Sequence, residues 1–196
     1  MNKKLATALS GGAVLVLALS GCGSSEEKNT VDDWAKKYCD QAKAQFKSKA
    51  EAEQLIRSTA TDGKPADIQA ADSKAFQDLA DANKAFAAAF NGAGTTPVEK
   101  DAELVKAAVA ERDANAKSYV ELKKQMDGLD VQDQQTFADG LKAVADGLAK
   151  VEENENAWNK LRDSETGRAM AKQQGCKPVK VVTPPKSGGA SGSTAP

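Results

Sequence analysis

The sequence of 196 residues contains no histidine. Histidine is the commonest general base in enzymes and the commonest protein ligand of transition metals. Its absence excludes Ser-His-Asp and Cys-His nucleophile arrangements, and it excludes zinc sites that include histidine. The phosphate-binding patterns GxxxxGKS/T and GxGxxG are missing as well. We therefore expect no catalytic residue, no metal site and no cofactor.

Aromatic residues are scarce too, at 5% of the chain, and alanine supplies much of the 40% of apolar residues. Alanine, leucine, lysine, glutamate and glutamine favour helices, whereas β-branched residues are sparse in the middle of the chain. A thin core rich in alanine suits closely packed helices better than a sheet. The sequence thus predicts an all-α fold, an antiparallel up-down bundle of four main helices plus a short C-terminal helix, closed by one disulfide.

Neither sign of charge dominates, since 27 basic residues stand against 28 acidic ones and the net charge is −1. Charges of both signs are mixed along the chain, which is typical of solvated helix faces. No basic field exists that would hold nucleic acid, so we expect no nucleic-acid partner.

The N-terminus has the layout of a secretory signal peptide. Lys3 and Lys4 precede an apolar run over residues 5–18, and small residues follow it. This run is shorter than the roughly 20 apolar residues that a membrane-spanning helix needs. Residues 1–21 are therefore predicted to be a signal peptide.

The four residues Leu19-Ser20-Gly21-Cys22 resemble the lipobox of bacterial lipoprotein precursors. In that class a transferase attaches a diacylglyceryl group to the cysteine sulfur, and a signal peptidase then cuts before the cysteine. The resemblance implies that Cys22 becomes an acylated first residue, anchored in the cell membrane on its extracytoplasmic face. Each buried CH₂ of an acyl chain contributes about 0.8 kcal/mol, so two or three chains hold the protein firmly. The alternative is an ordinary cleaved signal peptide with a coincidental cysteine.

The mature chain divides into three parts by composition. A short polar stretch at residues 22–30 is predicted to be the acylated cysteine and a flexible tether. Residues 31–176 are predicted to form the helical bundle domain. Residues 177–196 are rich in proline, glycine and serine, and we expect a disordered tail there.

Helical spacing of apolar residues predicts the elements of the bundle. The first helix is expected to follow an N-cap at Thr30 and to end before residue 61. Its apolar pattern weakens from Lys47 to Glu53, which leaves open whether it is continuous or broken. The second helix is expected over residues 66–90, with Asn91-Gly92 as a C-terminal stop.

The third and fourth helices have clearer signals. Thr96 and Glu99 form a capping box for a helix that runs to about Asp127. Gly140 and Gly147 interrupt the fourth helix, and we expect them to mark the close approach of a neighbouring helix. The apolar seam of the fourth helix alternates spacings of four and three: Phe137, Leu141, Val144, Leu148, Val151 and Trp158.

Cys39 and Cys176 are the two cysteines that remain once Cys22 is acylated. Two cysteines in an exported domain most simply form a disulfide. In an up-down bundle the fourth helix ends beside the start of the first, and Cys176 follows a short helix predicted over 163–175. The pair can therefore meet at the membrane-proximal end. A redox couple of free thiols is the alternative, but no CxxC spacing supports it.

Two charged features interrupt the predicted apolar stripes. Glu152, Glu153 and Glu155 form the densest acidic cluster, and Glu155 falls in the seam of the fourth helix. One interpretation is a glycosidase-like acid/base pair or a weak Ca²⁺ site; the other is a solvated face on which Glu155 pairs with a lysine or arginine. No calcium loop rich in Asp and Asn supports the first. Arg112 interrupts the apolar stripe of the third helix in a similar way. We expect a structural salt bridge there, and a ligand contact is the alternative.

Three aromatic residues have two open interpretations. Trp34, Tyr38 and Trp158 can line an apolar pocket at the membrane-proximal end, or they can pack in the core. Trp34, the pair Tyr38-Cys39 and a lone Cys176 also resemble the small uncharacterised helical lipoproteins of actinobacteria. This resemblance implies an outer-leaflet location on the plasma membrane and brings no catalytic residues.

These observations leave three hypotheses for function. The leading one is a lipid-anchored, non-enzymatic binding or structural protein of the cell envelope, with an envelope protein as a possible partner. The second is a carrier that holds a small apolar ligand between the helices. An apolar pocket larger than packing defects favours the carrier, and one exposed apolar patch favours the partner. The third, an enzyme that uses carboxylates alone, requires two facing acids in a cleft.

We expect the mature protein to contain no free thiol, because one cysteine is acylated and the other two are bridged. Alkylation followed by non-reducing mass spectrometry measures this directly. A mass with two alkylated thiols would show that Cys39 and Cys176 are not joined.

Overall fold

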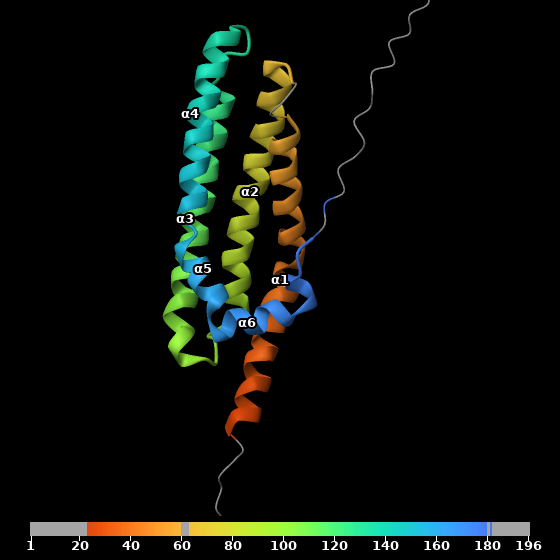
Figure 1. Ribbon diagram of the computed structural model, residues 1–196, viewed down its shortest axis with the longest axis vertical. Coiled ribbons are helices and arrows are strands. Elements are labelled where there is room, and N and C mark those ends of the chain that lie inside the picture. The colour runs from red at the N-terminus through yellow and green to blue at the C-terminus, as the bar shows by residue number, and fades with distance from the viewer. Residues whose placement is uncertain (1–22, 60–62, 180, 182–196) are drawn as a thin grey trace, which may run out of the picture.

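The computed structural model describes residues 23–59, 63–179 and 181. The predicted signal peptide, Cys22 and most of the predicted tail lie outside these described residues. The chain is helical over most of the described part (Figure 1), and no helix there is long and apolar enough to cross a membrane. The elements in chain order are α1 (Gly23–Thr59), α2 (Pro65–Ala93), the 3₁₀ turn η1 (Glu99–Asp101), α3 (Ala102–Asp127), α4 (Gln134–Glu153), α5 (Asn156–Asp163), α6 (Glu165–Lys172) and the 3₁₀ turn η2 (Gln174–Cys176).

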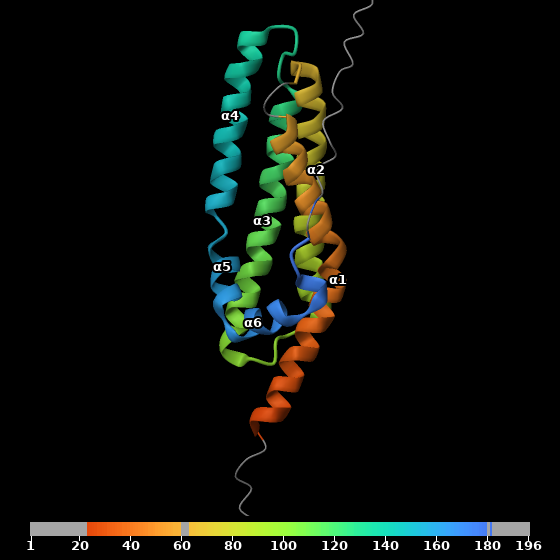
Figure 2. The ribbon, with the colours of Figure 1, turned by 45° about the vertical axis from the view of Figure 1, so that its right-hand side comes forward.

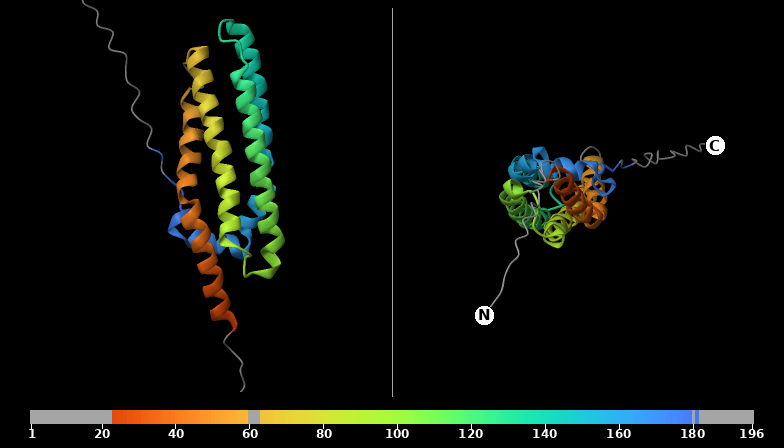
Figure 3. Two further views of the ribbon diagram at one scale, coloured as in Figure 1. Left: turned by 180° about the vertical axis from the view of Figure 1, so that it is seen from behind. Right: turned by 90° about the horizontal axis from the view of Figure 1, so that it is seen from below.

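The first four helices run alternately up and down, as predicted (Figures 1 and 2). The α1–α2 and α3–α4 connections lie at one end of the molecule, which we call the distal end. The α2–α3 connection lies at the other, which we call the stapled end. Helix α1 packs on α2, α2 on α3 and α3 on α4, and α6 crosses the stapled end from α5 to α1 (Figure 3). The all-α bundle is confirmed, although the layout of four helices plus one is approximate because the predicted fourth helix is divided into α4 and α5.

Helix α1 is continuous from Lys47 to Glu53, where its apolar pattern weakens. Ion pairs at four-residue spacing, such as Lys49 with Glu53, support this stretch, and each contributes about 0.2–0.5 kcal/mol. The helix also begins at Gly23, so the flexible tether predicted up to Thr30 is replaced by helix from Gly23 onward.

Helix α2 continues past the predicted stop at Asn91-Gly92, and that prediction was wrong. The stop is Gly94, whose φ of 86° is accessible to glycine without steric cost. Its N–H donates to the carbonyl oxygens of Phe90 and Asn91. Gly92 is helical, and a Cβ at this position would lie 2.2 Å from Oε1 of Gln41 on α1. Gly92 therefore permits the contact of α2 with α1, and Gly94 ends α2.

The start of α3 also differs from the prediction. A 3₁₀ turn follows the predicted capping box, and the α-helix begins at Ala102. Thr96 is buried and accepts a hydrogen bond from the N–H of Val98 at 3.3 Å. Its hydroxyl also bonds to the hydroxyl of Thr166 in α6 at 3.0 Å. Thr96 thus ties the α2–α3 connection to α6 and does not cap α3.

The predicted role of the two glycines on α4 is confirmed. A Cβ on Gly140 would lie 2.4 Å from Cδ2 of Leu129, and one on Gly147 would lie 2.7 Å from Cδ2 of Leu122. Both glycines therefore let α4 approach α3 and its C-terminal turn closely. The predicted seam is buried in part: Phe137, Val144 and Val151 are buried, whereas Leu141, Leu148 and Trp158 are half-buried.

The buried side chains form two clusters along the bundle. The cluster at the stapled end is rich in aromatic rings, and Tyr38 stacks on Phe90 with their centroids 4.2 Å apart. Trp34 donates from Nε1 to the carbonyl oxygen of Gly94 at 2.8 Å. The distal cluster contains fewer large side chains, chiefly Phe76, Leu79, Tyr119, Leu122 and Met126.

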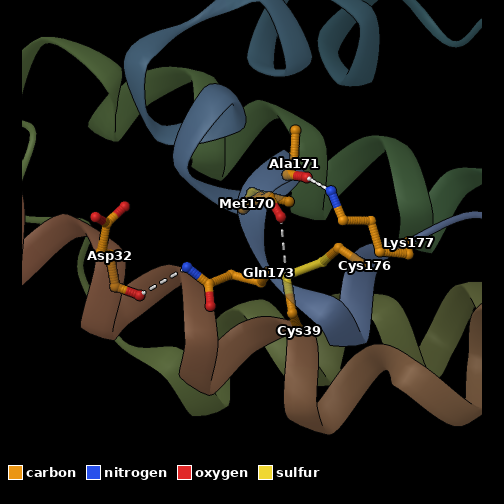
Figure 4. Close-up of a disulfide and its surroundings, with 7 residues drawn as sticks. All are labelled: Asp32, Cys39, Met170, Ala171, Gln173, Cys176 and Lys177. Carbon is orange, nitrogen blue, oxygen red and sulfur yellow. Dashed lines mark hydrogen bonds between the residues drawn. A yellow bond between two sulfur atoms is a disulfide. The ribbon is translucent and has the colours of Figure 1, made fainter.

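A disulfide joins Cys39 of α1 to Cys176 of η2, as predicted (Figure 4). The Cα atoms are 5.1 Å apart, and 137 residues separate the cysteines in sequence. A loop of this length gives a stabilisation of roughly 5 kcal/mol in the chain-entropy treatment. Gly175 permits the contact, since a Cβ there would lie 2.3 Å from the carbonyl oxygen of Cys39. Nearby, the Gln173 side-chain amide donates to the carbonyl oxygen of Asp32 at 3.4 Å.

Besides the disulfide, the buried carboxylate of Asp101 stabilises the stapled end. Oδ2 of Asp101 accepts a hydrogen bond from the N–H of Thr166 at 2.8 Å. Burial alone would raise the pKa of Asp101, but hydrogen bonds from Thr166 and Ser164 outweigh it, and the pKa lies below its ordinary value. This stabilisation is present above the unfolded-state pKa of about 3.9 and is lost as the pH falls through the folded-state pKa.

The first turn of α6 requires glycine at position 167, because it packs directly on the C-terminal end of α5. A Cβ on Gly167 would lie 2.0 Å from the carbonyl oxygen of Leu161 and 2.6 Å from Cα of Arg162, and backbone atoms cannot yield. We expect Gly167→Ala to lower the free energy of unfolding by about 2–4 kcal/mol. The control is Gly128→Ala, because its nearest neighbours lie at 3.5 and 3.6 Å, and it should change stability by less than about 0.5 kcal/mol. Urea unfolding followed by circular dichroism measures both, and equal stabilities would contradict the predicted clash.

Candidate functional site

A groove of about 480 Å³ lies between α1 and α4. Its floor consists of Leu79 from α2 and Tyr119 from α3, which are both buried, while Ile56 and Leu148 form half-buried walls. This volume is within the range of about 300–1,000 Å³ that is usual for small-molecule sites. The remaining residues of the groove are charged: Lys49, Glu53, Arg57, Glu152 and Glu155.

A second cavity of about 210 Å³ adjoins the groove, because Lys49 and Glu155 line both. We call it the aromatic chamber. The residues that line it besides these two are Tyr38, Phe46, Phe86, Arg112 and Trp158. The chamber therefore combines aromatic walls with one buried cation.

The buried cation is Arg112, whose side chain is 4% exposed. Its Nη1 donates to Oε1 of Glu155 at 3.0 Å and to Oδ1 of Asn83 at 3.3 Å. The guanidinium carbon also lies 4.7 Å from the ring centroid of Trp158 and 5.8 Å from that of Phe86. A cation over an aromatic face gains roughly 0.5–2 kcal/mol. Arg112 is thus held on one edge by hydrogen bonds and on its faces by aromatic rings.

The break between α4 and α5 provides the contacts to Arg112. Glu155 lies at the break, and Trp158 belongs to the first turn of α5. Glu111 of α3 accepts hydrogen bonds from the N–H groups of Ala157 at 2.7 Å and Trp158 at 3.0 Å. A carboxylate from another helix therefore caps α5 and stabilises the break. The sequence predicted one unbroken helix here, but Glu155 would then occupy the apolar seam.

The electrostatics differ between the two cavities. Burial raises the pKa of the Tyr119 hydroxyl, and the carboxylates of Glu155, Glu53 and Glu152 raise it further, whereas Arg112 acts in the opposite direction. The groove floor therefore holds a neutral hydroxyl in a negative field. The chamber, in contrast, contains the guanidinium of Arg112.

Of the three glutamates in the predicted acidic cluster, two line the candidate site. Glu152 and Glu155 line the groove, and Glu153 is exposed and does not. Glu155 pairs with Arg112, so the interpretation that a cation satisfies it is confirmed, as is the salt bridge expected for Arg112. Glu53 lies on the α1 side of the groove, but it pairs with a lysine of its own helix. Within residues 23–59, 63–179 and 181, no group of three or more acidic or cysteine side chains is arranged to hold a metal ion.

Both interpretations of the three aromatic residues hold in part. Trp34 and Tyr38 are buried in the core, as packing requires, and Tyr38 and Trp158 also line the chamber. Phe46 and Phe86 also line the chamber, and they were not identified from the sequence as candidate site residues. Lys49 was not predicted at all, because nothing distinguishes it from the other lysines of a charged helix.

Two further hollows lie on the surface, one beside the α2–α3 connection and one on the outer side of α3 and α4. Their charged lining residues, including Lys106, Lys117 and Lys150, are all exposed. Neither contains a buried cation like the one in the chamber. The groove and the aromatic chamber are therefore the candidate site.

No family model matches this chain, and neither a curated protein nor a solved structure matches it. The predicted lipid attachment at Cys22 lies outside the described residues.

The pair between Arg112 and Glu155 should contribute measurably to stability. Glu155→Ala leaves a buried guanidinium without its carboxylate, so we expect a loss of about 1–3 kcal/mol in the free energy of unfolding. Glu152→Ala is the control, because Glu152 is exposed on the same groove and makes no ion pair with the described residues. It should change stability by less than about 0.5 kcal/mol. Thermal or urea unfolding compares the two, and equal losses would show that the ion pair is not important for stability.

Proposed function

We propose that this chain is a non-enzymatic binding protein, lipid-anchored on the extracytoplasmic face of the cell membrane, which holds a small ligand with an apolar body in the α1–α4 groove. The observation that carries the proposal is the groove itself, at about 480 Å³. The groove is open to solvent, and the buried side chains of Leu79 and Tyr119 form its floor.

The apolar residues of the groove support an apolar ligand. Ile56 and Leu148 are half-buried and face the space between α1 and α4, and Leu79 lies beneath them on the floor. Covering such side chains contributes about 25 cal/mol for each Å² of apolar surface removed from water. The apolar part of a ligand thus finds a favourable surface between two charged rims.

A ligand in the groove is better supported than a hydrophobic protein interface. Among the described residues, the exposed large hydrophobic side chains are Val120 and Val179, and they belong to different parts of the chain. Protein interfaces generally use a contiguous apolar patch of several hundred Å². Two isolated valines do not form a contiguous apolar patch. The groove, in contrast, brings its apolar side chains together in a concave site.

The arrangement of carboxylates supports binding without catalysis. Glu53 and Glu155 lie on opposite sides of the groove, but each is paired with a cation. The carboxylates of Glu53 and Glu155 are therefore already engaged by Lys49 and Arg112. Glu152 alone is not sufficient for the acid/base chemistry that requires two carboxyl groups.

The anchor rests on the motif Leu19-Ser20-Gly21-Cys22. Helix α1 extends to Gly23 and projects from the stapled end (Figure 1). An acylated Cys22 would therefore attach the bundle to the membrane by its stapled end, with the distal end farthest away. The intact mass of the mature protein measures the acyl groups, and an unmodified Cys22 would contradict the anchor.

The groove is tested by titration with a neutral apolar fluorescent dye, such as N-phenyl-1-naphthylamine. We expect saturable binding at one site per chain. Leu148→Glu places a carboxylate on the apolar wall and should weaken binding at least tenfold, which corresponds to about 1.4 kcal/mol. Ala143→Glu is the matched control, because it adds the same charge at an exposed position of the same helix, and it should leave the affinity unchanged. Absence of saturable dye binding, or equal affinities of the two variants, would refute the proposed function.

A further inference from the structure

Arg112 has more hydrogen-bond donors than the protein uses. Both of its hydrogen bonds come from Nη1, to Glu155 and Asn83. A guanidinium carries five N–H donors in a fixed plane. Nε and Nη2 carry the other three N–H groups and make no hydrogen bond to a described residue. In the described part of the chain the buried side-chain atom without a partner is Oδ1 of Asp32, so Nε and Nη2 of Arg112 reach solvent and are accessible to a ligand.

The unused donors belong to one edge of the guanidinium. Nε–H and one N–H of Nη2 point in parallel, and this edge matches the two oxygens of a carboxylate in bidentate fashion. Arg112 lines the aromatic chamber, and Glu155 occupies only the Nη1 position. The chamber therefore contains a fork of donors that a second carboxylate would complete.

We propose that the site binds a long-chain carboxylic acid, with its carboxylate on the Nε/Nη2 edge of Arg112 in the aromatic chamber and its alkyl chain along the α1–α4 groove. This inference rests on the proposed function, because it assigns a chemical class to the ligand of the same groove. Lys49 and Glu155 line both cavities, so the two cavities are neighbours, and an extended molecule that occupies both must pass these two side chains.

The charges of the chamber favour a monoanion. Its charged lining residues are Lys49, Arg112 and Glu155, two cations and one carboxylate. Lys49 is shared with Glu53, which lines the groove and not the chamber. Burial also raises the pKa of Tyr38, so its hydroxyl remains protonated and is available as a neutral donor. Among the residues that line the chamber itself, the cations therefore outnumber the carboxylates by one.

The opposite orientation, with the carboxylate in the groove and the alkyl chain in the chamber, is unfavourable. Tyr119 on the groove floor is surrounded by the fields of Glu155, Glu53 and Glu152. The groove is lined by three carboxylates and by two cations, Lys49 and Arg57, so its carboxylates outnumber its cations by one. An alkyl chain placed there would meet the side chains of Leu79, Ile56 and Leu148. The electrostatics therefore direct the acid group to the chamber and the apolar chain to the groove.

The test compares dodecanoic acid with dodecanol as competitors for the neutral dye at neutral pH, where the acid is ionised. The two molecules have the same chain length and differ at the head group. Because charge-assisted hydrogen bonds are the stronger kind, we expect the acid to bind at least tenfold more tightly than the alcohol. This comparison uses the unmodified protein, so it does not depend on the folding of any variant.

The role of Arg112 is tested by Arg112→Gln, with Lys43→Gln as the matched control. Both substitutions remove one positive charge, but Lys43 is exposed on α1 and lines neither cavity. We expect the preference for acid over alcohol to fall below threefold in Arg112→Gln and to remain at least tenfold in Lys43→Gln. Equal loss in both variants would mean that general charge attracts the acid, and the assignment to Arg112 would be wrong.

The outcomes separate the inference from the proposed function. If acid and alcohol displace the dye equally, the groove binds apolar chains and the inference about Arg112 is overturned. If the dye binds and neither compound displaces it, the inference is overturned in the same way. If the dye itself does not bind, the proposed function fails and the inference fails with it.

Discussion

The burial of one guanidinium organises the half of the molecule that contains the candidate site. A charged group cannot leave water without compensation, and Arg112 lies near the middle of α3 with almost no exposed surface. Its compensation comes from three directions: Asn83 on α2, Glu155 at the α4–α5 break, and the ring of Trp158 on α5. An uninterrupted fourth helix would place Glu155 in an apolar seam. The break between α4 and α5, which Glu111 stabilises by capping α5, is what brings Glu155 and Trp158 to Arg112.

The scarcity of large side chains explains why the groove exists. Alanine at contact positions lets α1, α2 and α3 pack closely, as Ala52, Ala75 and Ala80 do in the distal cluster. The same small residues cannot fill the space between α1 and α4, which flank the bundle on its open side. Ile56 and Leu148 extend into this space but remain half-buried. A core rich in alanine therefore gives three tightly packed helices and a fourth that closes the bundle incompletely.

The sequence was sufficient for the fold class, the disulfide and the contact role of Gly140 and Gly147, since each depends on local periodicity or on simple counting. It identified Arg112 and Glu155 separately as interruptions of apolar stripes, but it did not pair them, because periodicity places a residue on a face without telling which residue lies opposite. The end of α2 was misplaced because two glycines lie close together and only the backbone conformation distinguishes their roles. The groove was not predictable, since it depends on the distance between two helices that are far apart in sequence.

The two ends of the site differ in how firmly they are held. At the stapled end, the disulfide, the hydrogen bonds of Asp101 and the cap from Glu111 fix α5 and α6 against α1 and α3. At the distal end, α4 packs on α3 through a single seam, and no comparable cross-link joins it to α1 in the described part of the chain. Directional hydrogen bonds need a rigid partner, whereas apolar contacts tolerate adjustment of a wall. A ligand with its polar group at Arg112 and its apolar chain toward the distal end would match this gradient of rigidity.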